Sequence, residues 1–250
     1  MSSIPRSDHQ TIFFISDLHL ALEKPKITQN FLNFLTNEAK KATKIYILGD
    51  LFDVWLGDDD FMPPINKIKY HLKELTESGV MIYLQQGNRD FLLGQQFCQQ
   101  TGLILLDEYS VINLFGIDTL LTHGDLLCSD DLAYQAFREK SHSKAWQQNV
   151  LSKPLVLRLL VARWYRVRSF FHKKNKSSEI MDVNQNTVIE IMQHYQVTRL
   201  IHGHTHRPAL HNFKINENTA QRFVLSEWSK NTVNLLSWNS QGYQMVPLKT

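Results

Sequence analysis

The sequence predicts an α/β fold in which two packed, mixed β-sheets are flanked by helices and carry an inserted helical lid. Three observations lead to this prediction. Short apolar runs of strand character alternate with runs of helical periodicity over most of the chain. A basic, apolar segment of helical character lies between His123 and His204. Three strand-like runs close the chain, and we assign them to the second sheet: 222–227, 233–238 and 243–247.

The individual elements follow in chain order. A buried strand is expected at Ile12–Ile15, and further strands are expected at 45–48, 80–84 and 200–202. After the first strand, four apolar residues fall on one face of a helix: Ile27, Phe31, Phe34 and Leu35. A later helix repeats this pattern with Val188, Ile191, Met192 and Tyr195. Apolar stripes at helical spacing face a core, so both helices are expected to pack against a sheet.

The length and composition are those of one globular domain. With 250 residues, 43% of them hydrophobic, the chain can bury a substantial core. Residues 1–10 are expected to form a disordered tail, so the domain spans 11–250, with the lid at about 132–176. No apolar run reaches the roughly 18 residues of a spanning helix. Two cysteines and a polar start indicate a cytoplasmic protein that is soluble or rests on a surface.

Five short polar motifs follow these strands. Side chains placed just after strand ends can converge at one edge of a sheet, and residues i and i+2 project to the same side. Carboxylate, amide and imidazole groups suit Mn, Fe or Zn. The motifs are Asp17-Leu18-His19, Gly49-Asp50-Leu51-Phe52-Asp53, Gly87-Asn88-Arg89-Asp90, His123-Gly124-Asp125 and Gly203-His204-Thr205-His206. Together they predict a site for two metal ions.

Two cations about 3.5 to 4 Å apart need a bridging carboxylate, and they can clamp the attacking and leaving oxygens of a phosphoryl displacement. We assign Asp50 as the bridge. One ion is expected to be held by Asp17, His19 and His206, and the other by Asn88, His123 and His204. Of the two neighbouring histidines in the last motif, His204 is favoured over His202 as the ligand.

Across residues 11–210, these motifs resemble those of the calcineurin-like metallophosphoesterases. That family usually has GNH followed by an acid, and its His protonates the leaving oxygen. Here the motif reads GNRD, and Arg89 cannot act as a general acid because a guanidinium keeps its proton. Arg89 can instead fork onto a phosphate. The substitution favours a leaving group that departs without protonation, as in pyrophosphate hydrolysis.

A narrower resemblance covers almost the whole chain. The segments ISDLHL, ILGDLFDVWLGDD, GNRDFLLG, THGDLLCSDDLAYQAFR, IMDVNQ and LIHGHTHRP are similar to the UDP-2,3-diacylglucosamine diphosphatase branch of lipid A biosynthesis. This resemblance implies that a metal-activated water attacks the α-phosphorus and releases UMP and 2,3-diacylglucosamine 1-phosphate. It also implies two Mn²⁺ ions. The residues expected to take part in catalysis are Asp50, Asn88, Arg89 and His123.

The resemblance also implies a set of substrate contacts. Asn88 and Arg89 are expected to hold the phosphates, and Asp131 is expected to contact the sugar or nucleoside end. The family's lid supplies a Ser, an Asn and a Lys. Ser169 and Lys176 keep that spacing, whereas the middle position is Lys173. The full set is Asn88, Arg89, Asp131, Ser169, Lys173, Lys176 and His204.

The inserted segment is strongly basic. Between Arg138 and Lys176 there are 11 Lys and Arg residues and one acid, Glu139. Leucines and aromatic residues interleave with Arg158, Arg163, Arg166 and Arg168. Such a segment can lie in an anionic membrane interface, line a pocket for acyl chains, or contact nucleic acid.

We interpret this segment as a lid that binds acyl chains and meets the cytoplasmic face of the inner membrane as a peripheral attachment. Neither a nucleic-acid partner nor an obligate protein partner is expected. Two alternatives stay open: a soluble-nucleotide phosphodiesterase or pyrophosphatase on the same fold, and a non-catalytic scaffold that would tolerate loss of ligands. The presence of all seven expected ligands argues against the scaffold.

Overall fold

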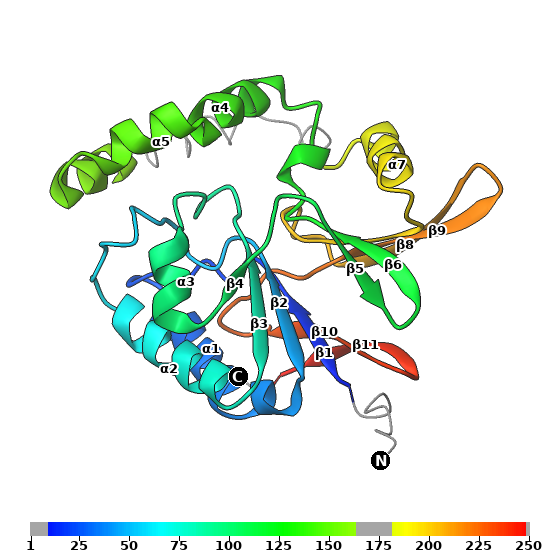
Figure 1. Ribbon diagram of the computed structural model, residues 1–250, viewed down its shortest axis with the longest axis horizontal. Helices are drawn as coiled ribbons and strands as arrows, with labels where there is room; N and C mark the ends of the chain where they lie inside the picture. Colours follow the sequence, from blue (N-terminus) through cyan, green and yellow to red (C-terminus); the bar gives the residue numbers. More distant parts are fainter. Residues whose placement is uncertain (1–9, 164–181, 249–250) are drawn as a thin grey trace, which may run out of the picture.

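The computed structural model describes residues 10–163 and 182–248. Two mixed β-sheets pack together and helices cover their outer faces (Figure 1). The predicted fold class is therefore confirmed. Ser169, Lys173, Lys176 and the rest of the predicted lid beyond residue 163 lie outside the described residues, as do residues 1–9 of the predicted tail.

The first sheet has six strands in the order β11-β10-β1-β2-β3-β4. Strands β1 to β4 run parallel, β10 pairs antiparallel with β1, and β11 pairs antiparallel with β10. The register places Ile12 opposite Lys44 on one side and opposite Trp238 on the other. The strands are β1 Ile12–Ile15, β2 Lys44–Leu48, β3 Met81–Gln85, β4 Ile104–Leu105, β10 Asn234–Asn239 and β11 Gly242–Pro247.

The second sheet has five strands in the order β5-β6-β7-β9-β8, with β6, β7 and β9 parallel. The sequence-based assignment of the last three strands was wrong for two of them, because β10 and β11 extend the first sheet beside β1. Alternating apolar residues identify a strand but not its partner. The strands are β5 Ser110–Leu114, β6 Ile117–Leu121, β7 Arg199–His202, β8 Ala209–Ile215 and β9 Asn218–Val224.

The helices complete a four-layer arrangement. α1, α2 and α3 lie on the outer face of the first sheet, whereas α7 lies against the second (Figure 1). α1 begins with Pro25, whose missing N–H is not needed at a first helical position, and Asn184 caps α7. The helices are α1 Pro25–Thr36, η1 Glu38–Lys41, α2 Ile65–Glu77, α3 Gln95–Thr101, η2 Asp125–Leu127, α4 Leu132–His142, α5 Lys144–Leu151 and α7 Gln185–His194.

The side chains of β1 alternate between two hydrophobic clusters. Phe13 and Ile15 point to the helices of the first sheet and pack in the same cluster as Phe31. Ile12 and Phe14 point the other way, into the cluster between the two sheets. The predicted stripes on α1 and α7 are confirmed as core contacts, although Ile191 of α7 and Tyr195, which follows the helix, are only partly buried. β1 is therefore fixed on both faces, which sets the position of the motif that follows it.

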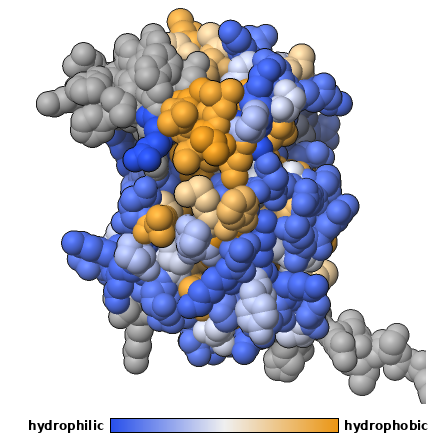
Figure 2. Space-filling model, turned by 90° about the vertical axis from the view of Figure 1, so that its left-hand side faces the viewer, coloured by the Kyte–Doolittle hydropathy of each residue, from blue (hydrophilic) through white to orange (hydrophobic). Residues whose placement is uncertain are grey.

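The described part of the lid consists of α4, α5 and a helical stretch at 155–163, and it runs across the top of the molecule in Figure 1. Its large exposed apolar side chains are Leu132, Phe137, Leu151, Val156, Leu157, Leu160 and Val161. Figure 2 shows apolar side chains gathered in the upper half of the face it presents. None of the helices in 10–163 and 182–248 has the length and apolarity that a membrane crossing requires.

Two buried contacts hold the lid to the core. Arg158, one of the basic residues of the inserted segment, is only 6% exposed and pairs with Asp59 and the carbonyl of Leu56. At the other end, Asp125 accepts hydrogen bonds from the Tyr134 hydroxyl (2.5 Å) and from Nε of Arg138 (2.6 Å). Both core anchors lie on loops that also carry predicted metal ligands, so the lid is tied directly to the site.

Candidate metal centre

All seven predicted ligands follow the carboxyl ends of parallel strands. Since β1, β2 and β3 are parallel in one sheet and β6 and β7 are parallel in the other, their ends meet at one edge of the sandwich. Ligands of open α/β sheets bind at such strand ends. The placements are Asp17 and His19 after β1, Asp50 after β2, Asn88 after β3, His123 after β6, and His204 and His206 after β7.

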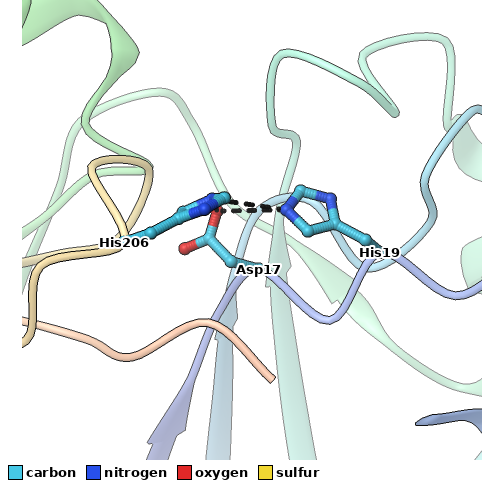
Figure 3. A group of neighbouring side chains, drawn as sticks. All are labelled: Asp17, His19 and His206. Carbon is cyan, nitrogen blue, oxygen red and sulfur yellow. Dashed lines mark hydrogen bonds and ion pairs between the residues drawn. The ribbon is translucent and has the colours of Figure 1, made fainter. Parts of the chain in front are cut away.

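Asp17, His19 and His206 form the first cluster (Figure 3). Nε2 of His206 lies 3.2 Å from Oδ1 of Asp17 and 3.3 Å from Nε2 of His19. Nε2 of His19 lies 3.9 Å from the same Asp17 oxygen. Two imidazole nitrogens and one carboxylate oxygen therefore converge, although they come from two different sheets.

Asn88, His123 and His204 form the second cluster. Oδ1 of Asn88 lies 3.0 Å from Nε2 of His123 and 3.0 Å from Nδ1 of His204. Nδ1 of His123 donates a hydrogen bond to the carbonyl of Leu48 at 2.9 Å. That bond fixes the tautomer of a neutral His123 and turns the lone pair of Nε2 toward the cluster.

Asp50 lies between the two clusters. Its Oδ2 is 3.6 Å from Nδ1 of His19, and its Oδ1 is 3.8 Å from Nε2 of His123. Asp50, Asp17 and His123 also form a second group of atoms that could share an ion. A carboxylate with one oxygen toward each cluster has the geometry that the bridging assignment requires.

The backbone at the site is conformationally strained. Five of the predicted ligands have φ between 49° and 69°, in the left-handed region: Asp17, His19, Asp50, His204 and His206. In the described part of the chain, only three other non-glycine residues have positive φ. Each such residue costs about 1–2 kcal/mol, and strain of this kind gathers at functional sites. The left-handed conformations therefore cost free energy locally, and they direct these side chains toward the site.

Glycines allow the loops to approach one another closely. A Cβ on Gly87 would overlap Oδ1 and the backbone nitrogen of Asp50. A Cβ on Gly203 would overlap the side chains of Ser16 and Asp17. The glycines of the GNRD and GHTH motifs are thus needed because a predicted ligand from another strand, Asp50 or Asp17, occupies the space beside them.

The electrostatics of the site favour cations. Asp17 and Asp50 are almost fully buried, and burial raises the pKa of Asp50 to about 7. Burial alone would lower the pKa of His123, but the charges of Asp50, Asp17 and Asp125 outweigh it and raise that pKa to about 9. The His123 shift shows that the carboxylates around it favour a positive charge at this point, and the Asp50 shift shows how little water reaches it.

The hydrogen-bonding groups also fit bound cations. Nδ1 of His19 is buried and has no hydrogen-bond partner among the described residues. Nδ1 of His123 donates to the carbonyl of Leu48, so Nε2 is the nitrogen that faces the Asn88 oxygen and the second cluster. A divalent cation can replace the proton at Nε2 of His123 and accept its lone pair. This donor set of oxygen and imidazole nitrogen suits a divalent ion of the Mn, Fe or Zn type.

Arg89 lies at the rim of this centre. Its side chain is 30% exposed, with Nε 3.7 Å from Oδ2 of Asp50 and Nη1 3.4 Å from Oδ1 of Asp53. Its backbone N–H donates to Oδ1 of Asp50 at 2.9 Å. Asp90 accepts from the backbone N–H groups of Gly87 and Phe52, and so ties the second motif to the third. Asp53 therefore orients Arg89, whereas Asp90 orders the loops.

Other polar residues near the motifs have structural partners. His202 faces away from the ligands, since its ring contacts the carbonyl of Gly203 and Nη1 of Arg222. Asp125 does not orient the ring of His123, because Nδ1 of His123 bonds to the carbonyl of Leu48 and Asp125 binds Tyr134 and Arg138 of the inserted segment. Asp131 caps α4 by accepting from the N–H of Tyr134, and its contact with substrate stays a prediction.

The acidic triple 58–60 is a structural loop. Asp58 caps α3 by accepting from the N–H groups of Gly94 and Phe97. Asp59 pairs with Arg158, and Asp60 accepts from the N–H of Met62 at 2.9 Å. The three carboxylates thus bind separate parts of the chain and do not converge on one point.

One charged residue at the centre was missed in the sequence. Glu227 lies beside the first cluster, with Oε2 3.0 Å from Nδ1 of His206 and Oε1 3.9 Å from Nε2 of His19. Glu227 was not considered a site residue because the predicted strand 222–227 included it, whereas β9 ends at Val224. An acid just after a buried strand is the same signal that identified the other motifs.

The chain is similar to several known proteins. The family described as calcineurin-like phosphoesterase matches residues 10–208. A Haemophilus ducreyi (strain 35000HP) protein named UDP-2,3-diacylglucosamine hydrolase is 47% identical over 236 residues, 94% of this chain and 99% of that protein. A protein of the same name from Escherichia coli O6:K15:H31 (strain 536) is 50% identical over 86% of this chain and 90% of that protein. An archaeal phosphodiesterase structure covers 96% of this chain and 100% of its own, with 13% identity and a TM-score of 0.49.

Proposed function

The chain belongs to the calcineurin-like phosphoesterase family, and from this premise we propose that it hydrolyses the pyrophosphate of UDP-2,3-diacylglucosamine. One observation carries the choice of substrate: the 47% identity to a hydrolase of that name extends over 94% of this chain, so it includes the lid as well as the metal motifs. Water adds to the α-phosphorus, and the bond from that phosphorus to the bridging oxygen breaks. The products are UMP and 2,3-diacylglucosamine 1-phosphate, an intermediate of lipid A biosynthesis.

We propose that two Mn²⁺ ions occupy the centre. Asp17, His19 and His206 would hold one, Asn88, His123 and His204 the other, and Asp50 would contact both; the distances within each cluster support this division. Bound divalent cations polarise a phosphoryl oxygen and lower the pKa of a water molecule. The protein contributes the buried negative charge of Asp17 and Asp50, which concentrates cations at this point.

The remaining residues bind and orient the substrate. The guanidinium of Arg89 can donate two parallel hydrogen bonds to a phosphate, and Asp53 holds its Nη1 toward the rim. Arg89 does not supply a proton, and a sugar phosphate departs from a pyrophosphate without one. Asp131, Ser169, Lys173 and Lys176 are proposed to contact the sugar and nucleoside, as the resemblance implies.

Replacing the planar guanidinium of Arg89 is expected to lower kcat/KM. Arg89→Lys keeps the positive charge but cannot form two parallel bonds, so kcat/KM should fall by roughly ten to several hundred fold, about 1.4–3.5 kcal/mol. Metal content measured by plasma emission should stay unchanged. A matched control is Arg207→Lys, whose guanidinium pairs with Asp182. An Arg89→Lys enzyme with unchanged kcat/KM would remove Arg89 from the phosphate site.

The reaction itself is tested by product analysis. Phosphorus NMR of UDP-2,3-diacylglucosamine incubated with the full chain and Mn²⁺ should show UMP and a sugar 1-phosphate. Chelation with EDTA should stop turnover, and added Mn²⁺ should restore it. In ¹⁸O-labelled water the label should enter UMP, because attack is on the α-phosphorus. Release of UDP, or label in the sugar phosphate alone, would contradict the proposed bond cleavage.

We also propose that the protein is peripheral to the cytoplasmic face of the inner membrane. The lid presents exposed apolar side chains, among them Val156, Leu157 and Leu160, and it carries exposed basic residues such as Lys144 and Lys153. Apolar groups with basic neighbours favour an anionic lipid surface. Flotation with anionic vesicles tests this placement, and recovery of the protein only in the vesicle-free fraction would contradict it.

A further inference from the structure

Glu227 contacts a predicted metal ligand from its outer side. Oε2 of Glu227 lies 3.0 Å from Nδ1 of His206, whereas Nε2 of the same ring faces Asp17 and His19. A neutral imidazole has one N–H donor and one lone pair. A hydrogen bond from Nδ1–H to the carboxylate therefore leaves the lone pair of Nε2 directed into the first cluster.

The position of Glu227 is held firmly by its neighbours. The next residue, Trp228, is 1% exposed, packs edge-on against Phe31 and Phe34, and donates its backbone N–H to the carbonyl of Asp17 at 3.2 Å. Two residues before Glu227, the N–H of Leu225 donates to the carbonyl of His202 at 2.7 Å. The segment is thus tied both to the start of the first motif and to the strand that carries His206.

His206 needs such support more than the other histidines of the site. Its side chain is 33% exposed, whereas those of His19 and His123 are 3% and 2% exposed. Packing alone holds a ring poorly when a third of it is exposed, and the φ of 56° at His206 adds strain to the loop. A carboxylate on the far nitrogen fixes the orientation of a ligating ring and raises its basicity.

We propose that Glu227 is a positioning residue of the metal centre: it holds His206 in the Nδ1–H tautomer and so strengthens the site nearest to Asp17 and His19. The inference rests on the proposed metal centre but not on the identity of the substrate. Glu227 does not touch the reacting atoms in this role. It acts through His206, with an expected effect on metal affinity of roughly 10- to 100-fold.

Metal binding tests the proposal without any turnover assay. The full chain is stripped with chelator and titrated with Mn²⁺, and free Mn²⁺ is followed by electron paramagnetic resonance. For Glu227→Ala, the Kd of one of the two ions should rise roughly 10- to 100-fold while the other changes little. Glu227→Gln keeps an acceptor oxygen for Nδ1–H and should recover part of the loss. Glu217→Ala, at an exposed acid of the β8–β9 turn, is the matched control and should bind as the parent does.

A spectroscopic measurement separates orientation from general damage. In the chain loaded with diamagnetic Zn²⁺, long-range ¹H–¹⁵N spectra should show His206 protonated at Nδ1 and ligating through Nε2. In Glu227→Ala that tautomer signature should weaken, while those of His123 and His204 persist. Mn²⁺ affinities within twofold of the parent, together with an unchanged His206 signature, would overturn the proposal. An enzyme that binds Mn²⁺ as expected but releases no UMP would instead contradict only the proposed substrate.

Discussion

Asp50→Ala is expected to abolish both metal binding and turnover. Asp50 has one carboxylate oxygen 3.6 Å from His19 and the other 3.8 Å from His123, so it is placed to contact both of the proposed cations. Loss of the metals removes several kcal/mol of charge stabilisation in the transition state, which corresponds to a fall in kcat of about 10³-fold or more. Metal content is measured by plasma emission and kcat by UMP release.

Folding should survive this substitution, which makes the result interpretable. Burial raises the pKa of Asp50 to about 7, so its charged form is disfavoured in the protein without metal. Removing it relieves this cost of burial but leaves the N–H of Arg89 without its acceptor, so the two effects oppose each other and the melting temperature of the chelated protein, measured by circular dichroism, should change little. Asp118→Ala, at an exposed acid of the β5–β6 hairpin, serves as the matched control. If Asp50→Ala still holds two ions and turns over, the bridging assignment is wrong.

The second large effect concerns the acyl chains of the substrate. If the lid binds them, each buried methylene contributes about 0.8 kcal/mol. Shortening both chains by four carbons would then remove up to about 6 kcal/mol, and kcat/KM should fall by roughly 10²- to 10⁴-fold. UDP-N-acetylglucosamine, which lacks long chains, should be nearly inert. The measurement is kcat/KM across a series of acyl lengths in detergent.

Variants in the lid test where these chains bind. Leu157 and Leu160 are 46% and 60% exposed, and large apolar side chains left exposed on one element indicate an apolar partner. Leu157→Ser with Leu160→Ser should weaken turnover of the long-chain substrate while metal content stays at the parent level. Ile117→Ser replaces a similarly exposed residue at the start of β6, away from the strand ends that carry the site. Equal rates on acylated and unacylated substrates would leave a general nucleotide pyrophosphatase in place of the lipid enzyme.

Much of the candidate metal centre could be predicted from the spacing of the motifs. The sequence placed seven candidate ligands after strand ends, and the structure brings all seven to one edge of the sandwich. The division into two clusters around Asp50 follows the expected sets, although assignment of the ions stays a prediction. Glu227 was not found because its strand ends three residues before it, and element boundaries are the least certain part of any sequence-based prediction.

The sequence by itself determined the local elements and the chemistry of the motifs. Strand and helix periods of 2 and 3.6 residues are properties of short segments, so Ile12–Ile15 and the α1 stripe could be identified without their partners. The residue types likewise show which atoms are able to bind a metal ion. Both kinds of information depend on neighbours in the chain and on nothing further away.

Only the tertiary structure decided which distant segments meet. β10 and β11 join the first sheet because β1 presents a free edge to them, a fact that no local period encodes. Arg158 is buried because Asp59 and the Leu56 carbonyl lie opposite it across about a hundred residues. Glu227 reaches His206 because Trp228 is anchored to Asp17. Such contacts depend on packing between elements. The free energy of a buried charge or of an unpaired strand edge depends on its partner, which is distant in the sequence.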